Sequence, residues 1–180
     1  SQRHYPNAKH ADRLLSDHIH ILEGCFCSFP DRTPPSFRAR CIANQYAQAS
    51  LAFLATGHPE KSKDLLRMGV ETDISFFSTS SPYCQYVVNY AFDYVREQGT
   101  RPNSEVVTRF VEATLGQLDH YQLDVAQLER KIWSTVGIAY DARNQGDIRQ
   151  VRAWLVRAIR LDWHWLSNMG VLGLMCEALC

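Results

Sequence analysis

The chain has 180 residues, 46% of them hydrophobic, which is enough to bury a substantial core in one domain or two small ones. Its 19 basic and 19 acidic residues cancel, so it lacks the broad positive charge of a general nucleic-acid binder. Six cysteines are too sparse for a secreted disulfide scaffold, and no apolar run approaches the ~20 residues of a transmembrane helix. Because Ser1–Asn7 is polar and unlike a signal peptide, we expect a cytoplasmic protein with reduced thiols.

Apolar residues recur three and four residues apart over almost the whole chain, as they do in amphipathic helices. The clearest stripes run from Leu14 to Phe26, from Tyr83 to Val95 and from Val106 to Leu118. No stretch shows the alternation of a β-strand bounded by hairpin turns. The sequence therefore predicts an all-α fold. The expected helices cover residues 8–28, 36–56, 59–72, 82–98, 104–118, 122–143, 147–161 and 170–180.

Proline and glycine separate these helices. Pro30, Pro34 and Pro35 mark a loop, and Pro35 suits the first turn of the next helix, where no backbone donor is needed. Gly57 lies in the following turn and is expected to take a left-handed conformation at little steric cost. Residues 99–103 and 144–146 predict two further turns.

Two segments of the chain, Gly57–Asp73 and Gly146–Asp162, resemble each other. Each follows a helix, and each ends on an aspartate sixteen residues after its glycine. The matched positions are Ser50 and Gly137, Phe53 and Tyr140, Leu65 and Trp154, Leu66 and Leu155, Gly69 and Ala158, Val70 and Ile159, and Asp73 and Asp162.

This repetition resembles the tetratricopeptide motif, a helix–turn–helix unit of about 34 residues in which small residues let two helices approach closely. The second copy departs from the motif by two extra residues between Tyr140 and Gly146, and Ser62 and Val151 stand where alanine is usual. We expect a tetratricopeptide-like array of antiparallel helix pairs (an α-α superhelix) in a single domain over residues 1–180. The repeats lie near 43–73 and 131–162, residues 82–118 are a candidate third pair, and the last helix is a cap.

The sequence contains no phosphate-binding loop, dinucleotide-binding fingerprint, serine-hydrolase elbow or zinc-protease motif. It also lacks the Asp-x-Asp pair that metal-dependent sugar transferases commonly use. His18 and His20, with Cys25 and Cys27, suggest a soft metal site only weakly, because the histidines face different sides of a helix and Cys-x-Cys is not a zinc-knuckle spacing. We predict no catalytic, cofactor-binding or metal-binding residue, and leave open a helical enzyme with an unfamiliar site.

Two surface features remain open in function. Five arginines surround the last repeat and either meet phosphate, acidic lipid or an acidic partner, or form a solvated face balanced by Asp141, Asp147 and Asp162. The apolar segment from Trp163 to Met175 either caps the last repeat or docks on a partner, another copy or a membrane surface. The arginines are Arg143, Arg149, Arg152, Arg157 and Arg160.

Tetratricopeptide grooves bind partners through the first helix of each pair, and the register of Ser50 and Gly137 predicts which residues would face such a groove. The polar members of this set could contact a peptide or could simply be solvated. The predicted groove residues are Asn44, Ala47, Leu51, Lys131, Ser134, Ile138 and Asp141.

Four segments, 22–26, 34–40, 43–57 and 158–172, are together similar to the helical C-terminal region of some bacterial, notably cyanobacterial, family 2 glycosyltransferases. The resemblance implies a parent enzyme that transfers a sugar from a nucleotide-sugar donor, with this chain as its non-catalytic accessory domain. The enzyme's catalytic residues have no counterpart here, and Ser1 would be an internal boundary of a longer protein.

The expected partner is then a protein or the catalytic domain of the parent chain. A homodimer stays open, nucleic acid is not expected, and membrane contact would come only through the parent. The alternative function is a stand-alone tetratricopeptide-like adaptor for protein–protein interaction.

Overall fold

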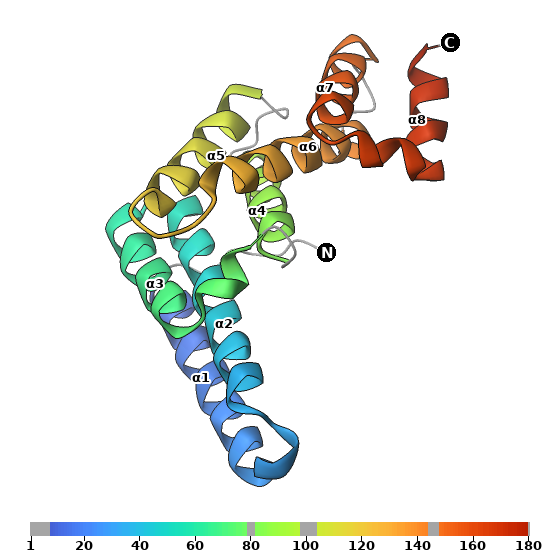
Figure 1. Cartoon of the computed structure of the whole chain (residues 1–180). Helices are drawn as coiled ribbons and strands as arrows, with labels where there is room; N and C mark the ends of the chain where they lie inside the picture. Colours follow the sequence, from blue (N-terminus) through green and yellow to red (C-terminus); the bar gives the residue numbers. More distant parts are fainter. Residues whose placement is uncertain (1–7, 79–81, 98–103, 144–147, 180) are drawn as a thin grey trace. The chain divides into compact units, whose positions relative to one another are not determined.

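The computed structural model describes residues 8–78, 82–97, 104–143 and 148–179 (Figure 1). Within these ranges, the side chains of residues 8–11, 93, 95–97, 104, 136–143, 148–151, 174 and 177–179 are not described. The described residues form α-helices and short 3₁₀ helices without any strand, which confirms the all-α prediction. The α-helices are α1 Ala8–Ser28, α2 Pro35–Ala55, α3 Pro59–Thr72, α4 Tyr83–Glu97, α5 Ser104–Leu118, α6 Val125–Arg143, α7 Ile148–Leu161 and α8 Met169–Leu179.

Three 3₁₀ helices, η1 Pro30–Arg32, η2 Ile74–Phe77 and η3 Trp163–Ser167, were not anticipated from the sequence. The helical periodicity that identified the longer elements cannot be recognised over three to five residues, so these short turns escape it. A helix that could span a bilayer is not found in the described part of the chain.

The chain divides into two compact units, Ser1–Leu123 and Asp124–Cys180. The first contains α1 to α5 and the repeat copy near residues 43–73, and the second contains α6 to α8 and the copy near 131–162. A single domain over residues 1–180 stays a prediction, because the compactness of each unit does not decide whether the two fold together.

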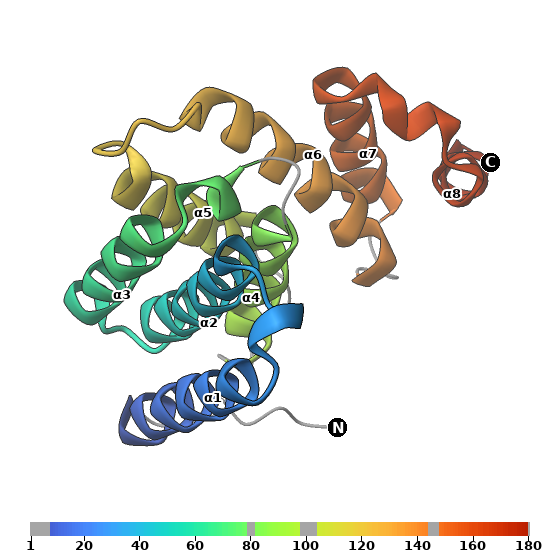
Figure 2. The ribbon, with the colours of Figure 1, turned by 60° about the horizontal axis from the view of Figure 1, so that its bottom comes forward.

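In the first unit, α2 is the central helix and packs against α1, α3, α4 and α5 (Figure 2). It can contact so many neighbours because it carries small side chains where they meet: Ala43 and Ala47 are fully buried, and Ser50 is 2% exposed. These residues lie at i, i+4 and i+7, so they form one stripe along the helix. The predicted third pair, α4 and α5, also packs together in this unit.

The contact between α2 and α3 is close. A methyl group built on Gly69 would lie 3.0 Å from Phe77 Cζ and 3.2 Å from Tyr46 Cβ. Further along, Ser50 Oγ donates a hydrogen bond to the Ser62 carbonyl oxygen at 2.9 Å. Ser62, which stands where alanine is usual, donates its hydroxyl to Gln117 Oε1 at 3.1 Å, so both serine hydroxyls are paired inside the core.

The turn between α2 and α3 follows the sequence prediction. Gly57 has φ of +79°, in the left-handed region, and the His58 amide donates to the Phe53 carbonyl at 2.9 Å. Pro35 and Pro59 both stand in the first turn of their helices, where proline needs no donor.

In the second unit, α7 packs against α6, η3 and α8. Its buried face carries Leu155 and Ala158, and α6 contributes Leu128 and Ile132, all at most 2% exposed. Helix α8 packs on α7 and η3, as a capping helix would, and buries Val171.

The close contact at Gly69 leads to a matched prediction. Gly69→Ala and Gly24→Ala both gain about 0.5–1 kcal/mol of helix propensity, but only the first must displace neighbouring atoms, since nothing lies within 4 Å of a methyl group on Gly24. We expect Gly24→Ala to be neutral or stabilising and Gly69→Ala to be less stable than it by about 1–2 kcal/mol in urea unfolding followed by circular dichroism. Equal stability of the two variants would contradict the close packing.

Candidate interaction surface

The two repeat copies end in the same local structure. After α3, Asp73 has φ and ψ of −156° and 94°, and its side chain accepts a hydrogen bond from the Ser75 amide at 3.0 Å. After α7, Asp162 has φ and ψ of −145° and 96°, and its side chain accepts from the His164 amide at 3.2 Å. Each aspartate thus caps the 3₁₀ helix that follows it, η2 or η3. The sequence match at these positions is a match of structure.

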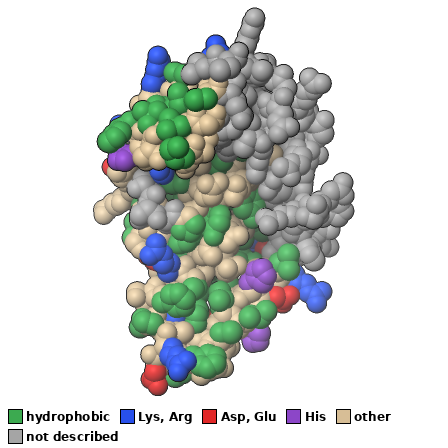
Figure 3. Space-filling view, turned by 90° about the vertical axis from the view of Figure 1, so that its right-hand side faces the viewer, with side chains coloured by type: hydrophobic (Ala, Val, Ile, Leu, Met, Phe, Trp, Pro, Cys, Tyr) green, Lys and Arg blue, Asp and Glu red, His purple; other side chains and the backbone are tan. Residues whose placement is uncertain are grey.

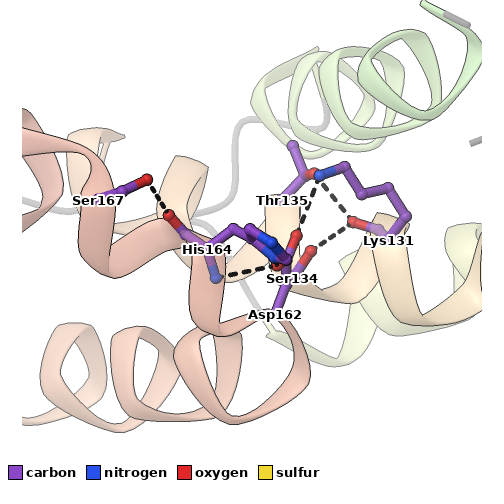
Figure 4. A network of polar contacts seen from close by, with 6 residues as sticks. All are labelled: Lys131, Ser134, Thr135, Asp162, His164 and Ser167. Atoms are coloured by element: carbon purple, nitrogen blue, oxygen red, sulfur yellow. Dashed lines mark hydrogen bonds and ion pairs between the residues drawn. The ribbon is translucent and has the colours of Figure 1, made fainter. Parts of the chain in front are cut away.

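In the second unit this cap is extended into an ion pair (Figure 4). Lys131 Nζ lies 3.1 Å from Asp162 Oδ2, and His164 Nδ1 lies 3.1 Å from Asp162 Oδ1. Partial burial alone would raise the pKa of Asp162, but the hydrogen bonds from Lys131 and His164 outweigh it and lower that pKa. The carboxylate therefore stays ionised and joins α6 to the start of η3.

The hydroxyls of α6 beside this ion pair are satisfied within the helix. Ser134 Oγ and Thr135 Oγ1 both donate to the Lys131 carbonyl oxygen, at 2.8 and 2.9 Å (Figure 4). Ser167 Oγ likewise donates to the His164 carbonyl oxygen at 2.7 Å. These three hydroxyl groups therefore bond to backbone carbonyl oxygens and do not compete for the Lys131–Asp162 ion pair.

All four tryptophans of the chain lie in the second unit. The rings of Trp133 and Trp154 are stacked with centroids 6.1 Å apart, and the Arg157 guanidinium lies over both, 5.1 and 5.2 Å from their centroids. Lys131 Nζ lies 5.3 Å from the ring centroid of Trp165. Two cations of this unit are thus held against indole rings by cation–π contact.

Large apolar side chains are exposed around η3. Trp163 is 69% exposed, Leu166 43% and Met169 80%, and Val156 on α7 is 38% exposed. Figure 3 shows hydrophobic side chains gathered at the top of one face, with Lys or Arg side chains at their edge. An exposed apolar group with a charged rim is the composition of many interaction surfaces.

Several of the predicted groove residues whose side chains are described are buried within their own unit. Leu51 is 1% exposed and Ser134 is fully buried, so neither offers side-chain atoms to a partner. Asn44 is half-buried and accepts a hydrogen bond from Gln48 Nε2 at 3.1 Å, while Lys131 is engaged by Asp162. Asp141 lies outside the described side chains. Of the other predicted residues, Ala47 is fully buried and Ile138 lies outside the described side chains.

The sequence pointed to Trp154 as a repeat position and to Arg157 as part of a basic cluster, but it did not predict their contact with Trp133. The only sequence signal of this contact is the placement of every tryptophan in the last third of the chain, among arginines. Register between two helices decides which of these rings and cations meet, and periodicity within one helix does not report it.

The histidines and cysteines of α1 do not form a metal site with each other. His18 Nδ1 lies 3.1 Å from Gln45 Oε1 of α2, and Cys25 and Cys27 are exposed free thiols. No group of three potential metal ligands is found among the described residues.

Comparison with protein-family models, curated proteins and solved structures finds no match to this chain. Its function is therefore inferred from its own residues.

Two substitutions separate the cap of Asp162 from its ion pair. Asp162→Asn keeps a capping oxygen but loses the charge, and should cost about 0.2–1 kcal/mol, the usual value of a partly exposed pair. Asp162→Ala loses both and should cost about 1 kcal/mol more. Urea denaturation followed by circular dichroism measures the effect at both aspartates, because both units are helical. Asp73→Asn is the control and should be neutral, since no described cation pairs with Asp73. Equal losses at Asp73 and Asp162 on substitution by Asn would contradict the ion pair.

Acid should weaken the second unit through Asp162. The folded pKa of this carboxyl is lowered, so its stabilising contribution is present above the unfolded value of about 3.9 and is lost as the pH falls through the folded pKa. Fluorescence-detected unfolding between about pH 5 and pH 2 should show a steeper loss of stability for the wild type than for Asp162→Asn. Parallel curves for the two proteins would show that Asp162 does not carry this dependence.

Proposed function

We propose that the chain is a non-catalytic helical interaction domain with tetratricopeptide-like helix pairs. The observation that carries this proposal is a difference between the two copies of the Asp-capped turn. In the first unit, Phe76 and Phe77 of η2 are at most 2% exposed, and Tyr83 of α4 meets Phe77 edge-on at 4.8 Å between ring centroids. The residue equivalent to Phe77 in the second unit, Leu166, is 43% exposed.

The second copy therefore presents a surface that the first copy covers from within its own unit. Trp163 and Met169, which are 69% and 80% exposed, enlarge this surface. A protein segment bearing an aromatic or aliphatic side chain, as α4 bears Tyr83, is the kind of partner that would cover it.

The finer form of the proposal is an accessory domain of a family 2 glycosyltransferase, located in the cytoplasm. Its support is the resemblance of segments 22–26, 34–40, 43–57 and 158–172 to the helical C-terminal region of such enzymes, which is drawn from the sequence alone. The partner would then be the catalytic domain of the same parent chain, and this domain would position an acceptor or mediate assembly.

One pair of substitutions tests whether the surface at η3 is open. Leu166→Glu should change stability by less than about 0.5 kcal/mol, because the side chain already meets solvent. Phe77→Glu, at the equivalent position of the first unit, should cost about 3 kcal/mol or more, because it buries a charge in place of an aromatic ring. Thermal unfolding by circular dichroism measures both, and a strongly destabilised Leu166→Glu would contradict an open surface.

The glycosyltransferase assignment is tested by the reading frame upstream of Ser1. We expect it to encode a nucleotide-sugar domain with an Asp-x-Asp pair, and that domain, expressed as a separate chain, should co-elute with residues 1–180 in gel filtration. Leu166→Glu should abolish the co-elution. A start codon within a few residues of Ser1 would instead identify a stand-alone adaptor, and the glycosyltransferase assignment would be withdrawn.

A further inference from the structure

The exposed face of α7 is rich in positive charge. The helix contains four arginines and no acidic residue. The next acid along the chain, Asp162, is engaged by Lys131 and His164 and so does not neutralise them. One alternative left open by the sequence was a solvated face whose arginines are balanced by three aspartates. Asp162 does not provide this balance, and the other two, Asp141 and Asp147, lie outside the described side chains.

The orientation of Arg157 on this face is fixed by contacts with two rings. Its guanidinium lies over Trp133 and Trp154 of two different helices. No described carboxylate pairs with it, and its ring contacts are the interactions recorded for it. A guanidinium stacked on rings keeps its N–H groups at its edge available, and these form a fork that fits a carboxylate with two parallel hydrogen bonds.

Arg160 lies one helical turn from Arg157, is exposed, and has no ion pair among the described residues. Side chains one turn apart are separated by about 5–6 Å. Carboxylates at alternate positions of an extended peptide are about 7 Å apart. Two successive carboxylates of such a peptide can therefore reach Arg157 and Arg160 together.

From this geometry we infer that α7 binds an acidic peptide segment of a protein partner, with Arg157 and Arg160 pairing with two of its carboxylates. The inference rests on the proposed interaction function and adds the charge chemistry of the partner. An anionic membrane is the competing partner, but attraction to a charged surface needs only diffuse positive charge. The stacking of Arg157 on two rings orients its donors, which favours a directional carboxylate contact.

The test uses residues 1–180 and a fluorescein-labelled, end-blocked peptide of sequence Glu-Ser-Glu-Leu-Glu-Ser-Glu, with binding followed by anisotropy at low salt. The control peptide has glutamine in place of every glutamate. We expect the acidic peptide to bind and the control peptide to bind at least tenfold more weakly, because charge-assisted hydrogen bonds are lost.

Protein variants locate the contact. Arg157→Lys keeps the charge but loses the fork, and should weaken binding about tenfold. Arg160→Gln removes a charge from the same face without touching the stacked rings, and should also weaken binding. Arg130→Lys is the matched control, because Arg130 is an exposed arginine of α6 without a recorded ring or carboxylate contact, and it should bind as the wild type does. An unchanged far-ultraviolet circular dichroism spectrum and an unchanged thermal unfolding midpoint show that each variant is folded.

Several results would overturn the inference. The first is absence of binding of the acidic peptide, and the second is binding of the glutamine peptide as tight as that of the acidic peptide. The third is binding of the acidic peptide by Arg157→Lys and Arg160→Gln as tight as by the wild type. Binding to vesicles of phosphatidylglycerol and phosphatidylcholine without binding to the peptide would identify a membrane partner instead. None of these results would affect the co-elution test at Leu166, so failure of this inference is distinguishable from failure of the proposed function.

Discussion

The contact between α2 and α3 is the constraint on which the first unit depends. Gly69 lets α3 approach α2 so closely that an added methyl group would meet Tyr46 Cβ at 3.2 Å. The small side chains Ala43 and Ala47 let α2 accept neighbours along its length. A central helix of this kind gains stability from dispersion contacts with several helices at once, which is why its small residues matter as much as its large ones.

The Asp-capped turn repeats at the end of each hairpin, but its surroundings differ. Asp73 bonds within its own turn, to the amide and hydroxyl of Ser75, whereas Asp162 also reaches Lys131 on α6. Phe77 after the first cap is buried, whereas the equivalent Leu166 after the second is 43% exposed. The same local structure therefore adjoins a buried aromatic core in one copy and exposed apolar side chains in the other.

The sequence was sufficient for the α-helices, because these depend on local spacing, and two aspartates that it matched, Asp73 and Asp162, cap similar turns. It failed at Leu51, which was expected to line a groove. The two-helix repeat predicts an open face there, but α2 also contacts α4 and α5, and the side chain is buried. The contact of Arg157 with Trp133 and the ion pair of Asp162 with Lys131 were missed for a related reason, since each joins residues more than twenty positions apart on separate elements.

Native-state hydrogen exchange tests most directly the central claim that the two hairpins end in one duplicated structure. In both copies the second residue after the aspartate, Ser75 or His164, donates its amide to the aspartate side chain. NMR-detected exchange should show both amides protected relative to an unstructured chain, although both residues are exposed. Protection at Ser75 without protection at His164, or the reverse, would contradict the duplication.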